Sequence, residues 1–124
     1  MADEIRQFAR QVLQTEASAV AGLAELLDES FDQAVRSILD CRGAVLATGI
    51  GKAGHIARKV SATLASTGTP SHFLSPTDAV HGDLGSIRDG DIVLVFSSSG
   101  ESDEIVRLLS IVKKLNHPVI AVTS

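Results

Sequence analysis

The sequence predicts an α/β fold built on a parallel sheet. Four short apolar segments of strand length alternate with longer segments whose apolar residues recur every three or four positions. This alternation is typical of parallel sheets with right-handed crossover connections. Two loops rich in glycine or serine come directly after two of the strands. Ligands bind beyond the carboxyl ends of the strands in such sheets, so we expect the functional site at these loops.

The first 42 residues are predicted to form helices. Apolar residues recur on one helical face of residues 3–27, at Ile5, Phe8, Val12, Val20, Leu23 and Leu27. The tetrapeptide S-F-D-Q from Ser30 fits a capping box and predicts the start of a second helix. Gly43 is well placed to end that helix. We therefore expect two N-terminal helices before a core that begins at residue 43.

Residues 43–124 are predicted to form the parallel α/β core. Strands are expected at residues 44–48, 72–75, 91–97 and 118–123, and helices at residues 53–67 and 102–116. The first of these strands, A-V-L-A-T, is continuously apolar, as in strands that are buried on both faces. The last strand reaches the end of the chain, where another functional loop would be expected. We therefore expect the domain to be incomplete.

Composition narrows the possible partners. The 124 residues are 44% hydrophobic and 21% charged, as in ordinary globular domains, and the formal net charge is −4. An acidic chain argues against nucleic acid or an anionic membrane as the main partner. The N-terminus lacks the apolar core of a signal peptide, and the apolar runs are far shorter than a membrane span, so a cytoplasmic location is expected. The single cysteine, Cys41, is expected to be a buried, inert thiol.

The loop T-G-I-G-K-A-G-H, which includes Gly49, Gly51 and Lys52, has the G-x-G-x-x-G spacing of a dinucleotide fingerprint. That fingerprint requires an acidic residue at the end of the second strand, but the nearest acid, Asp78, follows a proline in the next loop. A nucleotide P-loop would require glycine at Leu46 and a hydroxyl residue at Ala53. The remaining interpretation is an anion site at a helix N-terminus, with the Lys52 ammonium beside it.

The second loop, S-S-S-G-E-S, supplies four hydroxyls, from Ser97, Ser98, Ser99 and Ser102, and also leads into a helix. Hydroxyls and free amides can hold one phosphate group without metal or arginine. The alternative is that these serines only cap the helix, and one of them is expected to do so. Because four hydroxyls exceed what a cap requires, we predict a phosphate site.

These loops also carry a family resemblance. The motifs G-I-G-K-A-G-H-I-A-R-K, A-S-T-G-T-P, H-G-D-L-G and S-S-S-G-E-S-D-E-I, in this order, resemble the arabinose-5-phosphate isomerase (KpsF/GutQ) family of sugar isomerase (SIS) domains. The resemblance covers essentially all of the chain. It implies a flavodoxin-like, three-layer α/β/α sandwich that is truncated here, and a homo-oligomer, dimer or tetramer, with active sites near subunit boundaries.

The resemblance also implies the activity, which interconverts ribulose 5-phosphate and arabinose 5-phosphate for Kdo synthesis, for lipopolysaccharide or capsule. Family members continue beyond the end of this chain with a further glutamate, a histidine and a fifth strand, and longer members carry two CBS domains. No cofactor is implied. Many members have a metal-associated histidine where this chain has Ser75, so no metal site is expected, and His81 remains as the weak possibility for a metal ligand.

Functional residues can be carried over by motif. The catalytic positions match Lys52, His81 and Glu104. The phosphate-binding serines match Ser97, Ser99 and Ser102, with Ser98 beside them. The glycine loop adds Gly49 and Gly51, and the T-G-T-P motif implies that Gly68 and Thr69 lie beside the sugar.

The proposed chemistry moves a proton between adjacent carbons through an enediolate, which requires a base and stabilisation of the developing charge. Glu104 is expected in the first turn after the serine loop, where a solvated acid is also common. The base can equally be the family's further glutamate. Lys52 can neutralise the enediolate or contact the phosphate, and His81 can open the sugar ring or bond a neighbouring aspartate. A non-catalytic sugar-phosphate sensor and an isomerase of another phosphosugar remain as alternatives.

Overall fold

The computed structural model describes the backbone of residues 1–124 and every side chain except that of Asp83. The chain divides into two compact units, residues 1–35 and residues 36–124, and the boundary lies within a helix. The two units are described separately. No helix in the described part of the chain is long and apolar enough to cross a membrane.

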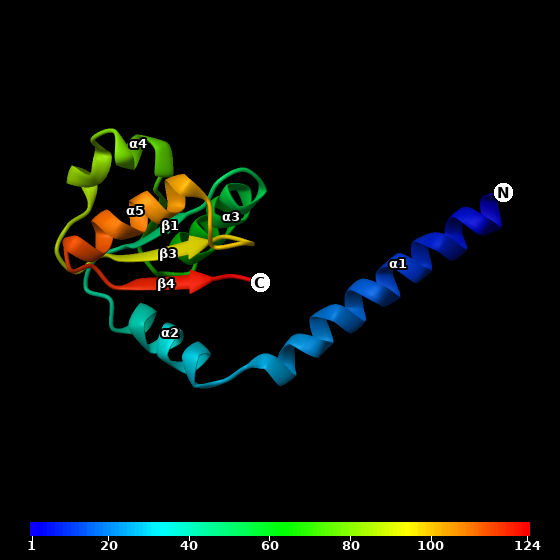
Figure 1. Cartoon of the computed structure of the whole chain (residues 1–124). Helices are drawn as coiled ribbons and strands as arrows, with labels where there is room; N and C mark the ends of the chain where they lie inside the picture. Colours follow the sequence, from blue (N-terminus) through cyan, green and yellow to red (C-terminus); the bar gives the residue numbers. More distant parts are fainter. The chain divides into compact units, whose positions relative to one another are not determined.

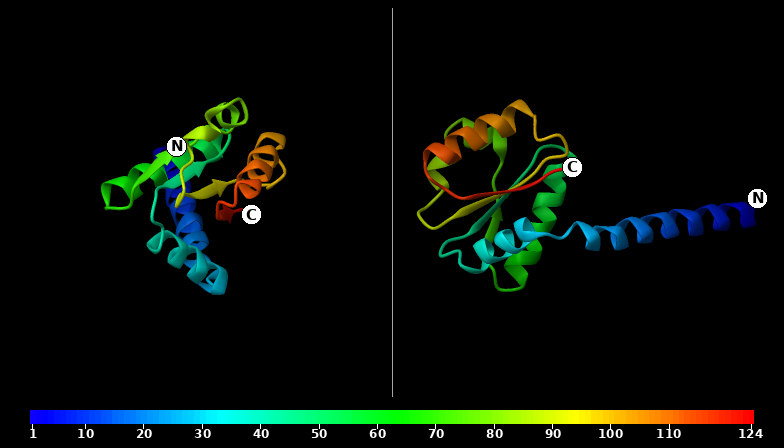
Figure 2. Two further views of the ribbon diagram at one scale, coloured as in Figure 1. Left: turned by 90° about the vertical axis from the view of Figure 1, so that its left-hand side faces the viewer. Right: turned by 60° about the horizontal axis from the view of Figure 1, so that its bottom comes forward.

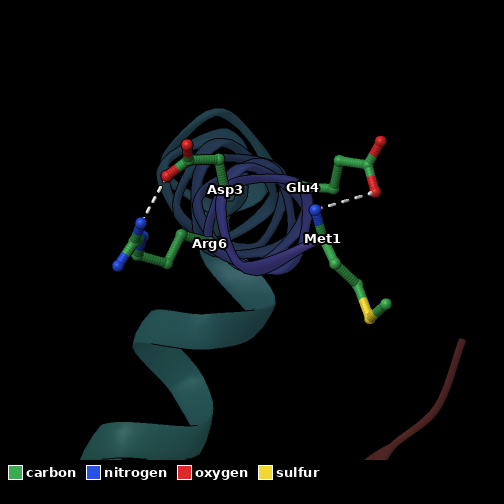
Figure 3. A network of polar contacts seen from close by, with 4 residues as sticks. All are labelled: Met1, Asp3, Glu4 and Arg6. Carbon is green, nitrogen blue, oxygen red and sulfur yellow. Dashed lines mark hydrogen bonds and ion pairs between the residues drawn. The ribbon is translucent and has the colours of Figure 1, made fainter.

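The first unit is helical. Helix α1 (Ala2–Gly22) is followed by a 3-10 turn, η1 (Leu23–Leu26), and by the start of α2 (Glu29–Leu39). The first turn of α1 carries two exposed ion pairs, one between the terminal amine of Met1 and Glu4 and one between Arg6 and Asp3 (Figure 3). None of the described α1 side chains is buried, and the predicted apolar face includes the exposed residues Ile5, Phe8 and Val20.

The start of α2 differs from the prediction. The helix begins at Glu29, and the side chain of Asp28, rather than that of Ser30, caps it. Asp28 Oδ1 accepts hydrogen bonds from the Ser30 amide at 2.9 Å and from the Ser30 hydroxyl at 2.6 Å. These bonds favour the ionised form and lower the pKa of Asp28. Aspartate and serine are both good N-caps, so two adjacent candidates were present in the sequence.

The second unit is built on a four-stranded parallel sheet in the order β2-β1-β3-β4. Figure 1 labels its neighbouring strands β1, β3 and β4. Its strands are β1 (Val45–Thr48), β2 (Ser71–Phe73), β3 (Ile92–Phe96) and β4 (Val119–Val122). Val45 pairs with Ser71 and Ile92, which sets the register of the central strands. Each strand lies within two residues of its predicted bounds.

Helices cover both faces of the sheet (Figure 2). Alternate residues of β1 and β3 point to opposite faces, so Leu46 and Val93 pack with Leu108 and Val112 of α5 (Asp103–Lys114). On the other face the strands pack against Val60 and Leu64 of α3 (Lys52–Ser66) and Ile38 of α2. Each fully buried leucine or valine contributes about 1.5–3 kcal/mol to stability. Because helices cover both faces of the sheet, the predicted three-layer sandwich is confirmed.

Two short helical elements were not predicted. They are α4 (Pro76–Val80) and the 3-10 turn η2 (Asp83–Ser86), both between β2 and β3. Ser75 caps α4, because its hydroxyl oxygen accepts a bond from the Asp78 amide at 3.3 Å. A serine followed by proline at the first helical position is a recognised helix start, but the segment is too short to show a helical period.

The buried carboxylate of Asp91 joins the backbone just before β1 to the backbone that leads into β3. Asp91 is 5% exposed, and its two oxygens accept bonds from the amides of Ala44 at 2.7 Å and Arg88 at 2.8 Å. Gly43, predicted to end the second helix, instead lies against this residue, where a Cβ would come within 2.8 Å of the Asp91 nitrogen. Cys41 lies just after α2 and is half-buried rather than buried, with its Sγ 3.3 Å from the Gly90 carbonyl oxygen.

Candidate functional site

The glycine and serine loops follow β1 and β3, which are neighbours in the sheet, and they line one cleft. The cleft has a volume of about 370 Å³, at the small end of the range for ligand pockets, which suits a small metabolite. Its polar lining consists of Lys52, Ser97, Ser98, Ser99 and Ser102, and its apolar lining consists of Ile50, Ala53, Phe96 and Ile105. The structure thus brings the four predicted phosphate-site serines together with Lys52 of the glycine loop.

The glycine loop depends on its glycines for two different reasons. Gly51 has a φ of 60°, in the left-handed region that favours glycine, immediately before α3 begins. Gly49 and Gly54 approach each other so closely that a Cβ on Gly54 would lie 2.7 Å from the Gly49 carbonyl oxygen. No described side chain caps the N-terminus of α3. Its first amides and its dipole are therefore available to an anion.

The serine loop is folded by its own hydroxyls. Ser97 Oγ accepts a bond from the Gly100 amide at 2.9 Å, and Ser99 Oγ accepts one from the Glu101 amide at 3.2 Å. Because each hydroxyl is used here as an acceptor, its proton remains available to donate to a ligand oxygen. Gly100 permits the turn, with a φ of 70°.

One serine of the loop was expected to cap the following helix, and only the position of Ser102 agrees with that expectation. Ser102 is the N-cap residue of α5, but its side chain makes no capping hydrogen bond. Its hydroxyl lies in the cleft lining instead. This arrangement favours the phosphate interpretation of the loop over the interpretation of four serines serving a helix start.

One contact of the serine loop was not foreseen. Ser124, after β4, donates from its hydroxyl to the Ser98 carbonyl oxygen at 2.6 Å, and the two hydroxyl oxygens lie 3.2 Å apart. The contact joins positions 26 residues apart across adjacent parallel strands, so no local sequence pattern announces it. Ser124 helps to hold the loop in the conformation that presents its hydroxyls.

The charges at the cleft favour an anion weakly. Lys52 lines the cleft, is exposed and makes no ion pair with any described side chain. None of the described lining residues is acidic. The acids Glu101, Asp103 and Glu104 lie just outside, at the end of the loop and in the first turn of α5. A phosphate would be held mainly by hydroxyls and amides, with one cation beside it.

Six of the predicted site residues do not line this cleft. Glu104 is exposed in the first turn of α5, and His81 is exposed at the end of α4. Gly68 and Thr69 precede β2, at the amino ends of the strands, whereas both loops lie at the carboxyl ends. Their predicted roles in catalysis or sugar binding stay predictions. Gly49 and Gly51 face a second cleft on the other side of the glycine loop.

A metal site would require side chains that can bind a metal ion to lie together. Within the described residues, no group of three potential metal ligands of the His, Cys, Asp or Glu types gathers. The position expected to differ from metal-binding relatives, Ser75, serves as the N-cap of α4. The weak possibility at His81 stays a prediction.

Comparison with known proteins agrees with this geometry. A family model described as the SIS domain matches residues 38–124. The chain is 42% identical over 120 residues to the arabinose 5-phosphate isomerase KdsD of Shigella flexneri, covering 97% of this chain and 37% of that protein. It is 44% identical over 116 residues to the arabinose 5-phosphate isomerase KpsF of an Escherichia coli O6:H1 strain, covering 93% of this chain and 36% of that protein. The present chain therefore spans little more than a third of the length of these curated relatives.

Among solved structures, one of an Escherichia coli CFT073 protein in complex with arabinose 5-phosphate superposes with a TM-score of 0.89. The two sequences are 38% identical, and the match covers 97% of this chain and 64% of that one. The α/β core and both loops of the present chain thus fall within the matched region.

Proposed function

The chain belongs to the SIS domain family, and from this premise we propose that it is part of an enzyme that interconverts D-ribulose 5-phosphate and D-arabinose 5-phosphate. The names of the relatives KdsD and KpsF support the choice of substrate. The observation that carries the proposal is the cleft in which Lys52 and four serines of the second loop converge. This cleft offers one phosphate group hydroxyl donors, free helix amides and a cation.

Holding the phosphate is the first contribution to catalysis. A pentose phosphate anchored at the serine loop is fixed at one end, which lowers the entropic cost of bringing its carbonyl carbons to catalytic groups. Lys52 stabilises the negative charge that develops on the enediolate oxygens. The proton transfer between C1 and C2 requires a carboxylate base, either Glu104 or the family's further glutamate. His81 assists ring opening or binds sugar hydroxyls.

The use of the product, the cellular location and the oligomeric state are part of the same proposal. The product arabinose 5-phosphate feeds the synthesis of Kdo, for lipopolysaccharide or capsule, and the enzyme works in the cytoplasm without a cofactor. It acts as a homo-oligomer, dimer or tetramer. The exposed apolar side chains of α1, such as Ile5, Phe8 and Val20, support self-association, because exposed apolar patches mark interaction surfaces.

The test is thermal unfolding of this chain with D-arabinose 5-phosphate, D-ribulose 5-phosphate, inorganic phosphate and NAD in parallel. A ligand at a hundred times its Kd adds about 2.7 kcal/mol to the free energy of unfolding. We expect both pentose phosphates to raise the Tm more than inorganic phosphate does. The variant Lys52→Met should reduce these shifts. Lys59→Met removes an exposed cation of α3 that lines neither cleft, and should not change them.

The outcomes are distinct. A Tm shift with NAD alone would restore the dinucleotide interpretation of the glycine loop. No shift with either pentose phosphate would contradict a pentose-phosphate site in this chain. Larger shifts with a heptose or hexulose phosphate would assign the cleft to another phosphosugar.

A second function, non-catalytic binding of a sugar phosphate, is favoured by one observation. Glu104 and His81 do not line the cleft, so this chain by itself presents a phosphate-binding site without a carboxylate in the cleft lining. An NMR assay of arabinose 5-phosphate and ribulose 5-phosphate separates the two functions. Interconversion supports the isomerase, and its loss in Glu104→Gln would assign Glu104 a part in catalysis. Binding without interconversion in the full-length protein supports the binding module.

A further inference from the structure

A second cleft lies on the other side of the glycine loop, within the same unit. Its volume is about 290 Å³. Its lining comes from the glycine loop, α3, β2 and the start of α4, and it includes His55, Arg58, Phe73, Ser75 and Thr77. Among the residues whose side chains are described, Ile50 alone lines both clefts. We call it the Arg58 cleft.

Arg58 is exposed in this cleft, and its guanidinium contacts an aromatic ring. Its guanidinium lies 3.7 Å from the centroid of the Phe73 ring, a cation–π contact between α3 and β2. No described side chain forms an ion pair with Arg58. A cation–π contact uses none of the hydrogen-bond acceptors of a ligand, so the guanidinium N–H groups that point away from the ring stay available as donors. A planar set of donors matches the two oxygens of a carboxylate or phosphate.

The rest of the lining suits a negative group. Ser75 Oγ already accepts a bond from the Asp78 amide, so its own proton is free to be donated. Thr77 adds a second hydroxyl, and His55 adds a group that gains positive charge when protonated. None of the described lining residues is acidic. An anion here would meet donors on several sides and no opposing carboxylate.

From this arrangement we propose that the Arg58 cleft is a second anion subsite, which takes the carboxylate or phosphate group of a small ligand. It is separate from the serine-loop cleft, since the two share a single apolar residue. The proposal does not depend on the isomerase activity, because it rests on a different cation, different hydroxyls and a different face of α3.

The experiment is a pair of NMR titrations of this chain, one with sodium phosphate and one with sodium acetate, at constant ionic strength. The amides of Phe73, Ser75 and Thr77 report on the Arg58 cleft, and those of Ser98 and Ser99 report on the serine cleft. We expect saturable shifts in the first set with at least one anion. A response to phosphate alone identifies a phosphate ester as the ligand, and a response to acetate alone identifies a carboxylate.

The variant Arg58→Met keeps an apolar stem over Phe73 and removes the charge. It should weaken the Arg58-cleft response at least about tenfold, because a hydrogen bond to a charged group is worth about 1.5–3 kcal/mol. Arg58→Lys keeps the charge but loses the planar donors, so its anion affinity should lie between those of the original chain and Arg58→Met. This variant serves as the test if Arg58→Met folds poorly. Lys59→Met is the matched control, because it removes the neighbouring exposed cation outside the cleft.

Two results would overturn the proposal. One is the absence of saturable shifts at Phe73, Ser75 and Thr77 with either anion. The other is a response that Arg58→Met leaves unchanged. Its failure is distinguishable from failure of the proposed function, since the serine-cleft amides respond or stay silent independently of these three.

Discussion

The hydroxyl of Ser102 offers a direct test of what the serine loop is for. It lies at the N-cap of α5 without a capping bond and lines the cleft. Ser102→Ala should therefore weaken phosphate-ester affinity about ten- to hundredfold and leave the Tm nearly unchanged. Isothermal titration and thermal unfolding measure the two effects. Ser110→Ala, an exposed serine later in α5, is the control for both. A fall in Tm without a change in affinity would mean that Ser102 is only a cap.

Two glycines of the first loop should be sensitive to the same substitution for different reasons. Gly54→Ala places a Cβ 2.7 Å from the Gly49 carbonyl oxygen, so the backbone must shift, at a cost of about 1–3 kcal/mol. Gly51→Ala meets nothing within 4 Å, but the φ of 60° and ψ of −127° at this position are rarely adopted by other residues, at a cost of about 1–3 kcal/mol. Urea unfolding should show that both variants are destabilised by amounts in this range. An unchanged stability of Gly54→Ala would mean that the close approach relaxes easily.

At single residues, sequence patterns located those parts of the site that are local. The serine loop and Lys52 stand out because hydroxyls or a cation cluster next to glycines after a strand, and the structure puts them in one cleft. Ser124 and Arg58 did not stand out, because their partners, Ser98 and Phe73, lie far along the chain or on another element. Contacts of that kind depend on the order of the strands in the sheet, which no local sequence pattern reveals.

The start of helix α2 should depend on the ionisation of Asp28. Hydrogen bonding to Ser30 lowers the pKa of Asp28 below its usual value of 3.8. The folded-state pKa therefore lies below the unfolded one. The stabilisation is present above the unfolded pKa and is lost as the pH falls through the folded pKa. We expect the Cα chemical shifts of residues 29–35 to lose helical character over that acidic range.

Two variants isolate this effect. Asp28→Asn keeps an acceptor at the N-cap but cannot ionise, so its α2 helicity should keep only the pH dependence that comes from Glu29 and Asp32 in the first turn. Asp28→Ala removes the acceptor and should reduce α2 helicity at neutral pH. Equal helicity in Asp28→Ala and the original chain at neutral pH would show that another group caps α2.

Among the elements, those with a repeating pattern were predictable. Strands such as β1 and β3 are apolar throughout and lie between parallel neighbours, and α3 and α5 repeat their apolar residues at helical spacing. The five-residue α4 is shorter than the window in which a helical period can be recognised, although its Ser75–Pro76 start was visible. Short elements are fixed by tertiary packing, in this case by Ala79 in the core.

The two-unit division of the chain leads to a prediction about the whole molecule. All described residues that line the two clefts, and all those of the two core clusters, belong to residues 36–124. None of the described residues of α1 is buried. A segment of residues 28–124, which keeps α2 and its Asp28 cap, should fold and keep the amide shifts of the core. A segment that starts at residue 36 loses the cap and most of α2, and should be less stable because Ile38 packs on the sheet.

NMR spectra, phosphate titration and light scattering of the segment 28–124 and the whole chain test this directly. We expect the phosphate Kd at the serine-loop amides to be the same in both, because no cleft residue is removed. If α1 carries the self-association proposed above, the segment 28–124 should also have a lower molecular mass per particle than the whole chain. Loss of dispersed amide signals in the shortened chain would show that α1 contributes to the folded core after all. Loss of phosphate binding with a folded core and a lower mass would instead mean that the cleft is completed by a second copy of the chain.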